Sequence, residues 1–407
     1  MKRELKKLTL GHYFSAIVED HARNRSIGFV GEEPITYGEL GKRVTVLKIF
    51  LGERGIRRGD KIIILGENSS NWAAAYFAIT TMGAVAIPIL SDFPESDINH
   101  IIHHSEAAAA FVDERMFHYM DLNALESMRE VFSLNSFAIL KKDSPKTDNF
   151  WERLQKFPDK FFESEQTEER YRSLISPDDI REDDLAEILY TSGTTGHSKG
   201  VMLAHKNLVT NALAAPRALG GVNENSVILT LLPLAHAYGC TTTLVGGLSA
   251  GASLYFLTRK PSPKVLMDAM QQVRPTIVVG VPLVLEKVYH KKVLPLITNN
   301  RAVRLAAHIA IGRRLLYRKI GKKVLESFGG RLQSFVIGGA SLNNEVENFL
   351  IEAGIPYCIG YGLSECSPLV AAAAFPKLRF GSVGQVIPDV EVKIDEPDPE
   401  TGVGEIM

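Results

Sequence analysis

The sequence is poor in cysteine, in net charge and in long apolar segments. Its three cysteines, Cys240, Cys358 and Cys366, are too few and too scattered for a disulfide framework or a zinc site, which favours the reducing cytoplasm. A formal net charge of −1 excludes a general electrostatic attraction to nucleic acid. The N-terminus is basic but has no apolar core, so we expect no signal peptide.

Two long uncharged runs come nearest to a membrane span. They cover residues 72–90 and residues 226–258. Gly83 and Pro88 interrupt the first run, and Pro233 and several glycines interrupt the second. A membrane span needs about 20 mostly apolar residues, so we expect buried helices and strands in both runs instead.

Apolar strands alternate with amphipathic helices along most of the chain. The segments "DKIIILGEN" (60–68) and "AVAIPIL" (84–90) are typical of buried strands, and each follows a helical pattern. The same alternation returns after residue 226, for example in "TIVVGVP" (276–282). Helices between continuous apolar strands imply parallel sheets with helices on both faces.

The length of 407 residues exceeds what one hydrophobic core usually serves. We therefore predict an α/β fold with two doubly wound sub-domains, over residues 1–185 and 186–376. After Pro376 the pattern becomes short, alternating and punctuated by glycine and proline. This change predicts the start of a small β sub-domain over residues 377–407.

A run of glycine and hydroxyl residues follows the predicted strand "AEILYT" (186–191). The run comprises Thr191, Ser192, Gly193, Thr194, Thr195 and Gly196, with Lys199 close behind. Glycines let backbone N–H groups converge on an anion, and the hydroxyls and the lysine add donors and charge, so the run suits a polyphosphate. It fits neither the Walker pattern nor G-x-G-x-x-G. A flexible surface turn is the alternative.

The segment "YTSGTTGHSKGVMLAH" (190–205) resembles the phosphate-loop signature of the adenylate-forming, or AMP-binding, superfamily. That superfamily includes acyl- and aryl-CoA synthetases, luciferases and peptide-synthetase adenylation domains. Other family-like motifs occur along the chain in the expected order: "TYGEL" (36–40) before this segment, and "LPLAHAYG" (232–239), "VIGGA" (336–340) and "GYGLSE" (360–365) after it. The resemblance covers about residues 36–407. It implies the large N-terminal domain of these enzymes, whose final small element is β-barrel-like.

The resemblance implies an ATP-dependent ligase that joins an acid to a thiol. In such enzymes a carboxylate oxygen attacks the α-phosphorus of ATP, pyrophosphate leaves, and CoA then opens the acyl adenylate. We therefore expect ATP and Mg²⁺ as cofactors and CoA as co-substrate. The segment "VGVPLVLEKVYHKKVLPLI" (279–297) resembles long-chain fatty acid–CoA ligases, so we expect a fatty acid substrate. An aryl or medium-chain acid, and a non-catalytic nucleotide-binding role, are the alternatives.

The resemblance also assigns roles to individual residues. The run 191–196 and Lys199 would hold the β- and γ-phosphates, and Glu365 would bind Mg²⁺ with the Thr191 hydroxyl. Ser364 would contact the α-phosphate, and His236 would lie near the acid. The nucleotide-binding set is completed by Tyr361 against the adenine and by small residues that leave room: Gly338, Gly339, Ala340, Gly360 and Gly362. The alternatives are core packing for Tyr361 and His236, and an exposed helix start for Glu365.

A strongly basic stretch covers residues 287–331, where Glu326 is the only acidic residue. We weigh two interpretations of this stretch. One is a solvated helix face, and the other is peripheral contact with the anionic inner face of a membrane.

The family continues beyond the "GEI" segment (404–406) into a mobile C-terminal catalytic domain, which this sequence lacks. We therefore expect a truncated chain that binds ATP, forms acyl adenylate slowly and makes hardly any acyl-CoA. A hydrolase is a further alternative, because "GLSEC" (362–366) comes close to the G-x-S-x-G nucleophile motif. However, the motif ends in Cys366, and Ser364 has no convincing Asp and His partners downstream.

Overall fold

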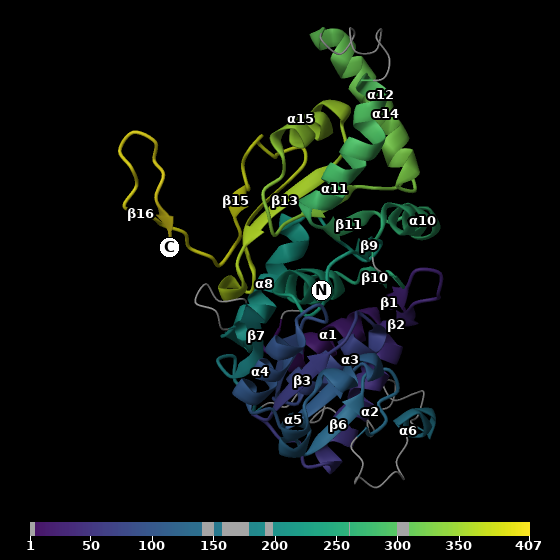
Figure 1. The fold of residues 1–407 in the computed structure, drawn as a ribbon, viewed down its shortest axis with the longest axis vertical. Helices are drawn as coiled ribbons and strands as arrows, with labels where there is room; N and C mark the ends of the chain where they lie inside the picture. Colours follow the sequence, from purple (N-terminus) through teal and green to yellow (C-terminus); the bar gives the residue numbers. More distant parts are fainter. Residues whose placement is uncertain (1–4, 141–149, 157–178, 192–197, 260, 299–308) are drawn as a thin grey trace.

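A computed structural model describes residues 5–140, 150–156, 179–191, 198–259, 261–298 and 309–407 (Figure 1). The elements gather into two lobes, each built around a sheet, with helix α8 (His205–Ala218) near their junction. Helix α1 (Leu10–His21) joins the lobes, because it packs against helices of one lobe on one side and against α8 on the other. The α/β fold class predicted from the sequence is confirmed.

The first lobe holds a six-stranded sheet in the order β6–β5–β3–β4–β7–β8. Its pairs are parallel except β7–β8, which is antiparallel. The strands are β3 (Lys61–Leu65), β4 (Val85–Ile89), β5 (Ala109–Val112), β6 (Glu130–Ser133), β7 (Leu185–Thr191) and β8 (Lys199–Ala204).

Alternate residues of β3 bury into different cores. Ile62 and Ile64 pack with helices α1, α2 (Tyr37–Glu53) and α3 (Ser70–Thr81), whereas Ile63 and Leu65 pack toward α4 (Glu95–Ser105). This period of two is the pattern of a strand covered on both faces. The smaller helical elements of this lobe are η1 (Glu114–Tyr119), α5 (Leu122–Ser127) and α6 (Phe150–Lys156).

The second lobe holds a nine-stranded sheet in the order β15–β14–β13–β12–β11–β9–β10–β1–β2. It is parallel from β1 to β13, with antiparallel strands at both edges. The strands are β1 (Arg25–Phe29), β2 (Ile35–Thr36), β9 (Val227–Thr230), β10 (Ser253–Phe256), β11 (Ile277–Gly280), β12 (Ser334–Ile337), β13 (Tyr357–Gly362), β14 (Leu369–Ala374) and β15 (Gln385–Val386).

Helices cover both faces of this larger sheet. Ile277 and Val279 of β11 face the core shared with α8 and the π-type helix η2, and Val278 faces the opposite core. The remaining helical elements are η2 (Tyr238–Val245), α9 (Gly246–Ser249), α10 (Pro263–Val273), α11 (Pro282–Val288), η3 (Tyr289–Val293), α12 (Leu294–Thr298), α14 (Ala310–Ser327), α15 (Asn344–Ala353) and η4 (Ser364–Cys366).

Side-chain caps fix where several helices begin. Thr36 and Glu39 form a capping box at the start of α2, in which each side chain accepts from the other residue's N–H. Ser69 caps α3 by accepting from the N–H of Trp72 at 3.0 Å. Asn343 caps α15, and Gly354 ends that helix with a φ of 70°. These contacts satisfy N–H groups that have no partner inside the helix.

The sheets exchange segments across the predicted boundary at residue 185. Strands β1 and β2 belong to the nine-stranded sheet, and β7 and β8 belong to the six-stranded one. The division into 1–185, 186–376 and 377–407 therefore stays a prediction about folding units, since the sheets themselves cross it.

Three short strands follow Pro376, and they are divided between two sheets. Strand β15 extends the large sheet, and β16 (Ile394–Asp395) pairs with β17 (Glu405–Ile406) in a separate ribbon. The described residues form no closed barrel. Nor does any helix among them have both the length and the apolar character to cross a membrane.

Candidate nucleotide-binding site

A hairpin at the edge of the six-stranded sheet carries the predicted phosphate run. Thr191 ends β7 and lies opposite Lys199, the first residue of β8. Thr191 is partly exposed and Lys199 is exposed. The predicted ligands between them, Ser192, Gly193, Thr194, Thr195 and Gly196, lie outside the described residues. The hairpin brings the two described members of the run together.

The sequence did not predict β8. Its start reads as part of a glycine-rich loop, but residues 199–204 pair with β7 along its length. Gly200 allows this close pairing, because a Cβ at that position would lie 2.9 Å from Cγ2 of Ile188.

The carboxyl ends of β12 and β13 bring the predicted adenine-site glycines together. The neighbouring strands pair Ile337 with Ile359, so Gly338 and Gly360 follow side by side. A Cβ on Gly338 would lie 2.8 Å from the ring of Tyr238 and 3.3 Å from the carbonyl oxygen of Gly360. Gly339 has a φ of 84°, which favours glycine, and open space where a side chain would stand. Ligands of open α/β sheets bind at such strand ends.

Tyr361 and Gly362 form the end of β13, and the Tyr361 side chain is partly exposed. Gly362 admits a close crossing of the chain, because a Cβ there would overlap the carbonyl of Pro368. Ala340, which follows Gly339, is exposed at the same end of the sheet. All six residues predicted to surround the adenine therefore lie at the carboxyl ends of β12 and β13.

His236 lies just before η2, whose first residue, Tyr238, contacts Gly338 at the carboxyl end of β12. It is exposed, yet desolvation of its ring lowers the pKa below the ordinary value of 6.5. Its Nδ1 accepts a hydrogen bond of 3.2 Å from the N–H of Tyr238. Both effects favour a neutral imidazole with its proton on Nε2.

Tyr238 is a site residue that the sequence analysis missed. Its ring packs against Gly338, and its buried hydroxyl has no hydrogen-bond partner among the described residues. Burial raises the pKa of this phenol well above its ordinary value, so the group remains a donor. The sequence pattern could not identify Tyr238 as a site residue, because its proposed role depends on a contact with Gly338, which is distant in sequence.

A tight turn after β13 carries Ser364 and Glu365. The N–H of Leu363 donates to the carbonyl of Pro368 at 3.0 Å, which closes the turn. Glu365 is exposed, and no described lysine, arginine or histidine pairs with its carboxylate. The turn contacts β8, so the carboxylate and Lys199 belong to adjoining segments.

Two asparagines that the sequence analysis did not identify brace these segments. Asn211 of α8 is 4% exposed and donates to the carbonyls of Cys366 (3.2 Å) and Leu369 (2.8 Å). Its Oδ1 accepts from the N–H of Leu369 at 3.2 Å. Asn68 similarly donates to the Leu232 carbonyl and accepts from the Leu234 N–H, both at 2.7 Å. One asparagine thus holds the Glu365 turn, and the other holds the segment before His236.

The described residues contain no cluster of three or more groups that could hold a metal by themselves. Glu365 is an exposed carboxylate in a turn that contacts the phosphate hairpin. Mg²⁺ binds through one or two carboxylates plus phosphate oxygens and waters. The donor set therefore fits a magnesium ion that a nucleotide brings with it.

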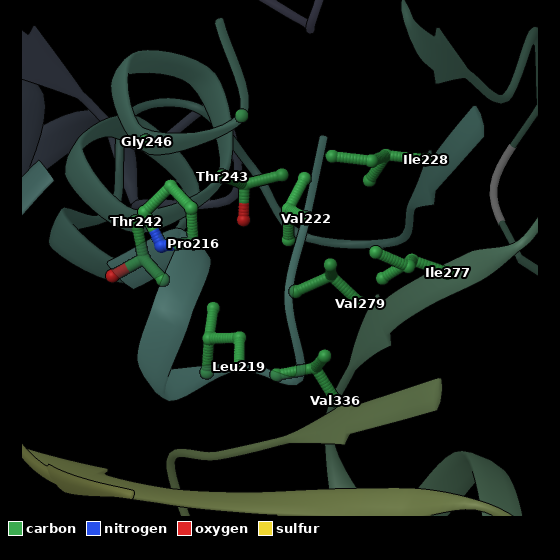
Figure 2. A pocket seen from close by; sticks show the side chains of 11 residues that line it. Pro216, Leu219, Val222, Ile228, Thr242, Thr243, Gly246, Ile277, Val279 and Val336 are labelled. Carbon is green, nitrogen blue, oxygen red and sulfur yellow. The ribbon is translucent and has the colours of Figure 1, made fainter. Parts of the chain in front are cut away.

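A small apolar cavity lies between the end of α8, η2 and the large sheet, and none of the predicted site residues lines it. Figure 2 shows the side chains around it, including Leu219, Val279 and Val336. Its volume of about 10 Å³ has room for no more than one water molecule.

Comparisons with known proteins agree on one family. A family model described as AMP-binding enzyme matches residues 15–407. Long chain acyl-CoA synthetase 5 of Arabidopsis thaliana is 26% identical over 94% of this chain and 60% of its own length. The long-chain-fatty-acid–CoA ligase FadD15 of Mycobacterium tuberculosis is 28% identical over 88% of this chain and 60% of its own length. The chain thus spans about 60% of the length of these curated relatives.

Solved structures share the fold. ATP-bound MatB from Rhodopseudomonas palustris superposes with a TM-score of 0.73 at 22% identity, covering 98% of this chain and 68% of that one. The anthranilate CoA ligase AuaEII, in complex with anthranoyl-AMP, gives a TM-score of 0.71 at 18% identity, covering 98% and 66%.

Proposed function

The chain belongs to the AMP-binding enzyme family, and we propose that it activates a carboxylic acid with ATP, as an acyl adenylate destined for the thiol of CoA. One observation carries this proposal. The hairpin with Thr191 and Lys199, the turn with Glu365 and the strand ends around Gly338 adjoin one another, although they lie far apart in sequence.

The charged residues act on the polyphosphate. Lys199 and the hydroxyl of Thr191 bind the β- and γ-phosphates and stabilise the departing pyrophosphate, since fixed donors lower the cost of charge developing there. Glu365 holds the magnesium ion, with Thr191 as a second oxygen ligand. Bound there, Mg²⁺ neutralises phosphate charge that would repel the incoming carboxylate.

The neutral groups position the base and the acid. The face of Tyr361 stacks on the adenine, with Gly338, Gly339, Ala340, Gly360 and Gly362 leaving space around it. His236, neutral and protonated on Nε2, donates to the acid carboxylate and adds no charge. Ser364 donates to the α-phosphate.

For the acid, we propose a long-chain fatty acid. The curated relatives named as long-chain acyl-CoA synthetases and ligases support this choice. An aryl or medium-chain acid is the second candidate, because an aryl-CoA ligase, the anthranilate CoA ligase AuaEII, shares the fold.

The test is magnesium-dependent ATP binding by the 407-residue protein, followed by acid-dependent ATP–pyrophosphate exchange with benzoate, octanoate and palmitate. We expect K199A and E365Q to weaken MgATP binding at least tenfold, as loss of one charge-assisted contact costs about 1.5–3 kcal/mol. K264A and E326Q remove exposed charges far from the site and should bind ATP normally. Equal affinity in all four variants would refute the site. Exchange with benzoate alone would select the aryl alternative.

A further inference from the structure

A helical arm projects from the larger lobe. We define the arm as residues 282–298 and 310–327, which form α11, η3, α12 and α14. Figure 1 shows its outer end beyond α15, on the side of the molecule away from the six-stranded sheet. None of the residues assigned to the nucleotide site belongs to the arm.

The outward face of α14 is basic. Ile320, Val324 and Phe328 pack inward from this helix and its end. The exposed positions follow the spacing of one helix face, and five of them carry a positive charge: Arg314, Arg318, Lys319, Lys322 and Lys323. The sequence alone left a solvated face and a membrane contact as equal interpretations of this charge.

Exposed aliphatic side chains lie beside these cations, at the outer end of α14. Ile311 and Leu315 are 76% and 67% exposed, and Ile309 just before the helix is 61% exposed. Leu296, near the end of α12, is 54% exposed. A solvated charged face does not need aliphatic residues grouped at its end, so this arrangement indicates a contact surface.

Little negative charge offsets the cations of the arm. Arg313 pairs with Glu352 at 2.8 Å. Within the ranges that the structure describes, no acidic side chain pairs with the five cations of the outward face. Glu326 is the only acidic residue of α14. The complementary surface is therefore anionic.

We propose that the arm docks on the surface of a lipid bilayer that contains anionic headgroups. Its cations contact lipid phosphates, while Ile309, Ile311 and Leu315 enter the boundary between headgroups and acyl chains. A nucleic acid or an acidic protein surface would satisfy the charges but leave the aliphatic side chains in water. A second copy of the chain would bring two positive faces together. A bilayer is the occupant that accommodates both features.

The first test is flotation of the 407-residue protein with phosphatidylcholine vesicles, with and without phosphatidylglycerol. We expect binding only to the anionic vesicles, and weaker binding as salt increases. The variant R314Q/R318Q/K322Q should bind on the order of a hundredfold more weakly, since each cation near the surface contributes about fivefold. The control K6Q/R23Q/K264Q removes three exposed cations elsewhere and should bind as the unaltered protein does.

The second test separates the aliphatic contribution. The variant I311S/L315S should reduce binding to anionic vesicles by at least about tenfold, because it removes apolar area that enters the bilayer. Circular dichroism and ATP binding should be unchanged in both arm variants, so failure here leaves the nucleotide site unaffected. Binding to neither vesicle, or undiminished binding by either arm variant, would overturn the proposal. So would self-association that I311S/L315S abolishes without any vesicle binding.

Discussion

At the scale of single residues, the primary amides of asparagine hold the proposed site together. Asn211 and Asn68 each present a donor and an acceptor to a loop whose main chain needs both. Few other side chains can supply both at one planar group. Because Asn211 connects the helix after the phosphate hairpin to the turn of Glu365, we infer that it positions the metal ligand without touching the nucleotide.

We predict that N211D raises the Mg²⁺ concentration needed for ATP binding. An ionised aspartate cannot donate to the carbonyls of Cys366 and Leu369, and its buried charge repels them. The requirement should rise about tenfold at about pH 8, a change of about 1.4 kcal/mol. It should return toward normal at about pH 5.5, where the protonated acid donates again. Fluorescent ATP titrated with Mg²⁺ at both pH values measures this.

N207D is the matched control on the same helix. Among the described residues Asn207 acts only as an acceptor, from the N–H of Ala204 at 2.9 Å, and aspartate keeps that function. The control should therefore show the unaltered Mg²⁺ requirement at both pH values. If N211D lowers thermal stability but leaves the Mg²⁺ requirement unchanged, Asn211 is a structural residue only.

At the scale of elements, β7 combines an open end with a buried middle. Thr191 at its end faces the site, whereas Glu187 is fully buried and accepts a 2.8 Å hydrogen bond from the Tyr76 hydroxyl. Burial raises the pKa of Glu187 from its ordinary 4.5 to about 7, and the Tyr76 hydrogen bond offsets only part of that shift. Its other carboxyl oxygen has no partner among the described residues.

His205, the first residue of α8, titrates in the opposite direction. Burial lowers its pKa from 6.5 to about 4, although the charge of Asp184 acts the other way. The folded protein therefore resists protonating His205 and favours protonating Glu187. The first effect removes stability as the pH falls from about 6.5 to 4, and the second adds stability as it falls from about 7 to 4.5.

We predict that E187Q and H205N change the pH dependence of unfolding in opposite senses. The free energy of unfolding of the unaltered protein, minus that of E187Q, should increase by about 3 kcal/mol from about pH 7.5 to pH 4.5. The free energy of unfolding of the unaltered protein, minus that of H205N, should decrease by a similar amount over the same pH range. Denaturant unfolding at several pH values measures both. Parallel pH profiles for E187Q and the unaltered protein would show that Glu187 is ionised in the native state.

Elements marked by their own apolar runs or capping residues were predictable, and elements defined by a distant partner were not. The buried strands β3, β4 and β11 and the helices α2, α3 and α15 follow from apolar patterning and capping residues. Strand β8 has a mixed composition, and its partner β7 rather than its own pattern makes it a strand. The transfer of β1 and β2 to the far sheet also depends on tertiary pairing with β10.

The same distinction applies to the candidate site. Glu365 and Lys199 belong to motifs that can be identified in the sequence. Asn211 contacts Leu369, and Tyr238 contacts Gly338. The spacing of residues near Asn211 or Tyr238 in the sequence does not predict either contact. Sequence patterns thus reached the groups proposed to touch ligand, whereas the groups that hold them needed the fold.

At the scale of the whole molecule, one hydrophobic core serves both lobes. It joins residues of α1, α2 and α3 to residues of η2, β9, β11 and β12. Hydrogen bonds cross the same junction, where the hydroxyls of Tyr13 and Tyr37 donate to the carbonyls of Val245 and Ala252. The two lobes therefore share one of the three hydrophobic clusters, and each lobe has a further cluster of its own.

We predict that the two lobes unfold together. The two tryptophans, Trp72 and Trp151, lie in the six-stranded lobe, and the buried thiol of Cys358 lies in β13 of the other. In a C240A/C366A background, tryptophan fluorescence and thiol labelling should report the same denaturant midpoint, as a shared core requires. Y37F should lower both midpoints equally, because it removes a buried hydrogen bond worth about 1 kcal/mol at the junction. A fluorescence transition that precedes exposure of Cys358 would instead mean that the lobes are separate folding units, divided near the predicted boundary at residue 185 although the sheets cross it.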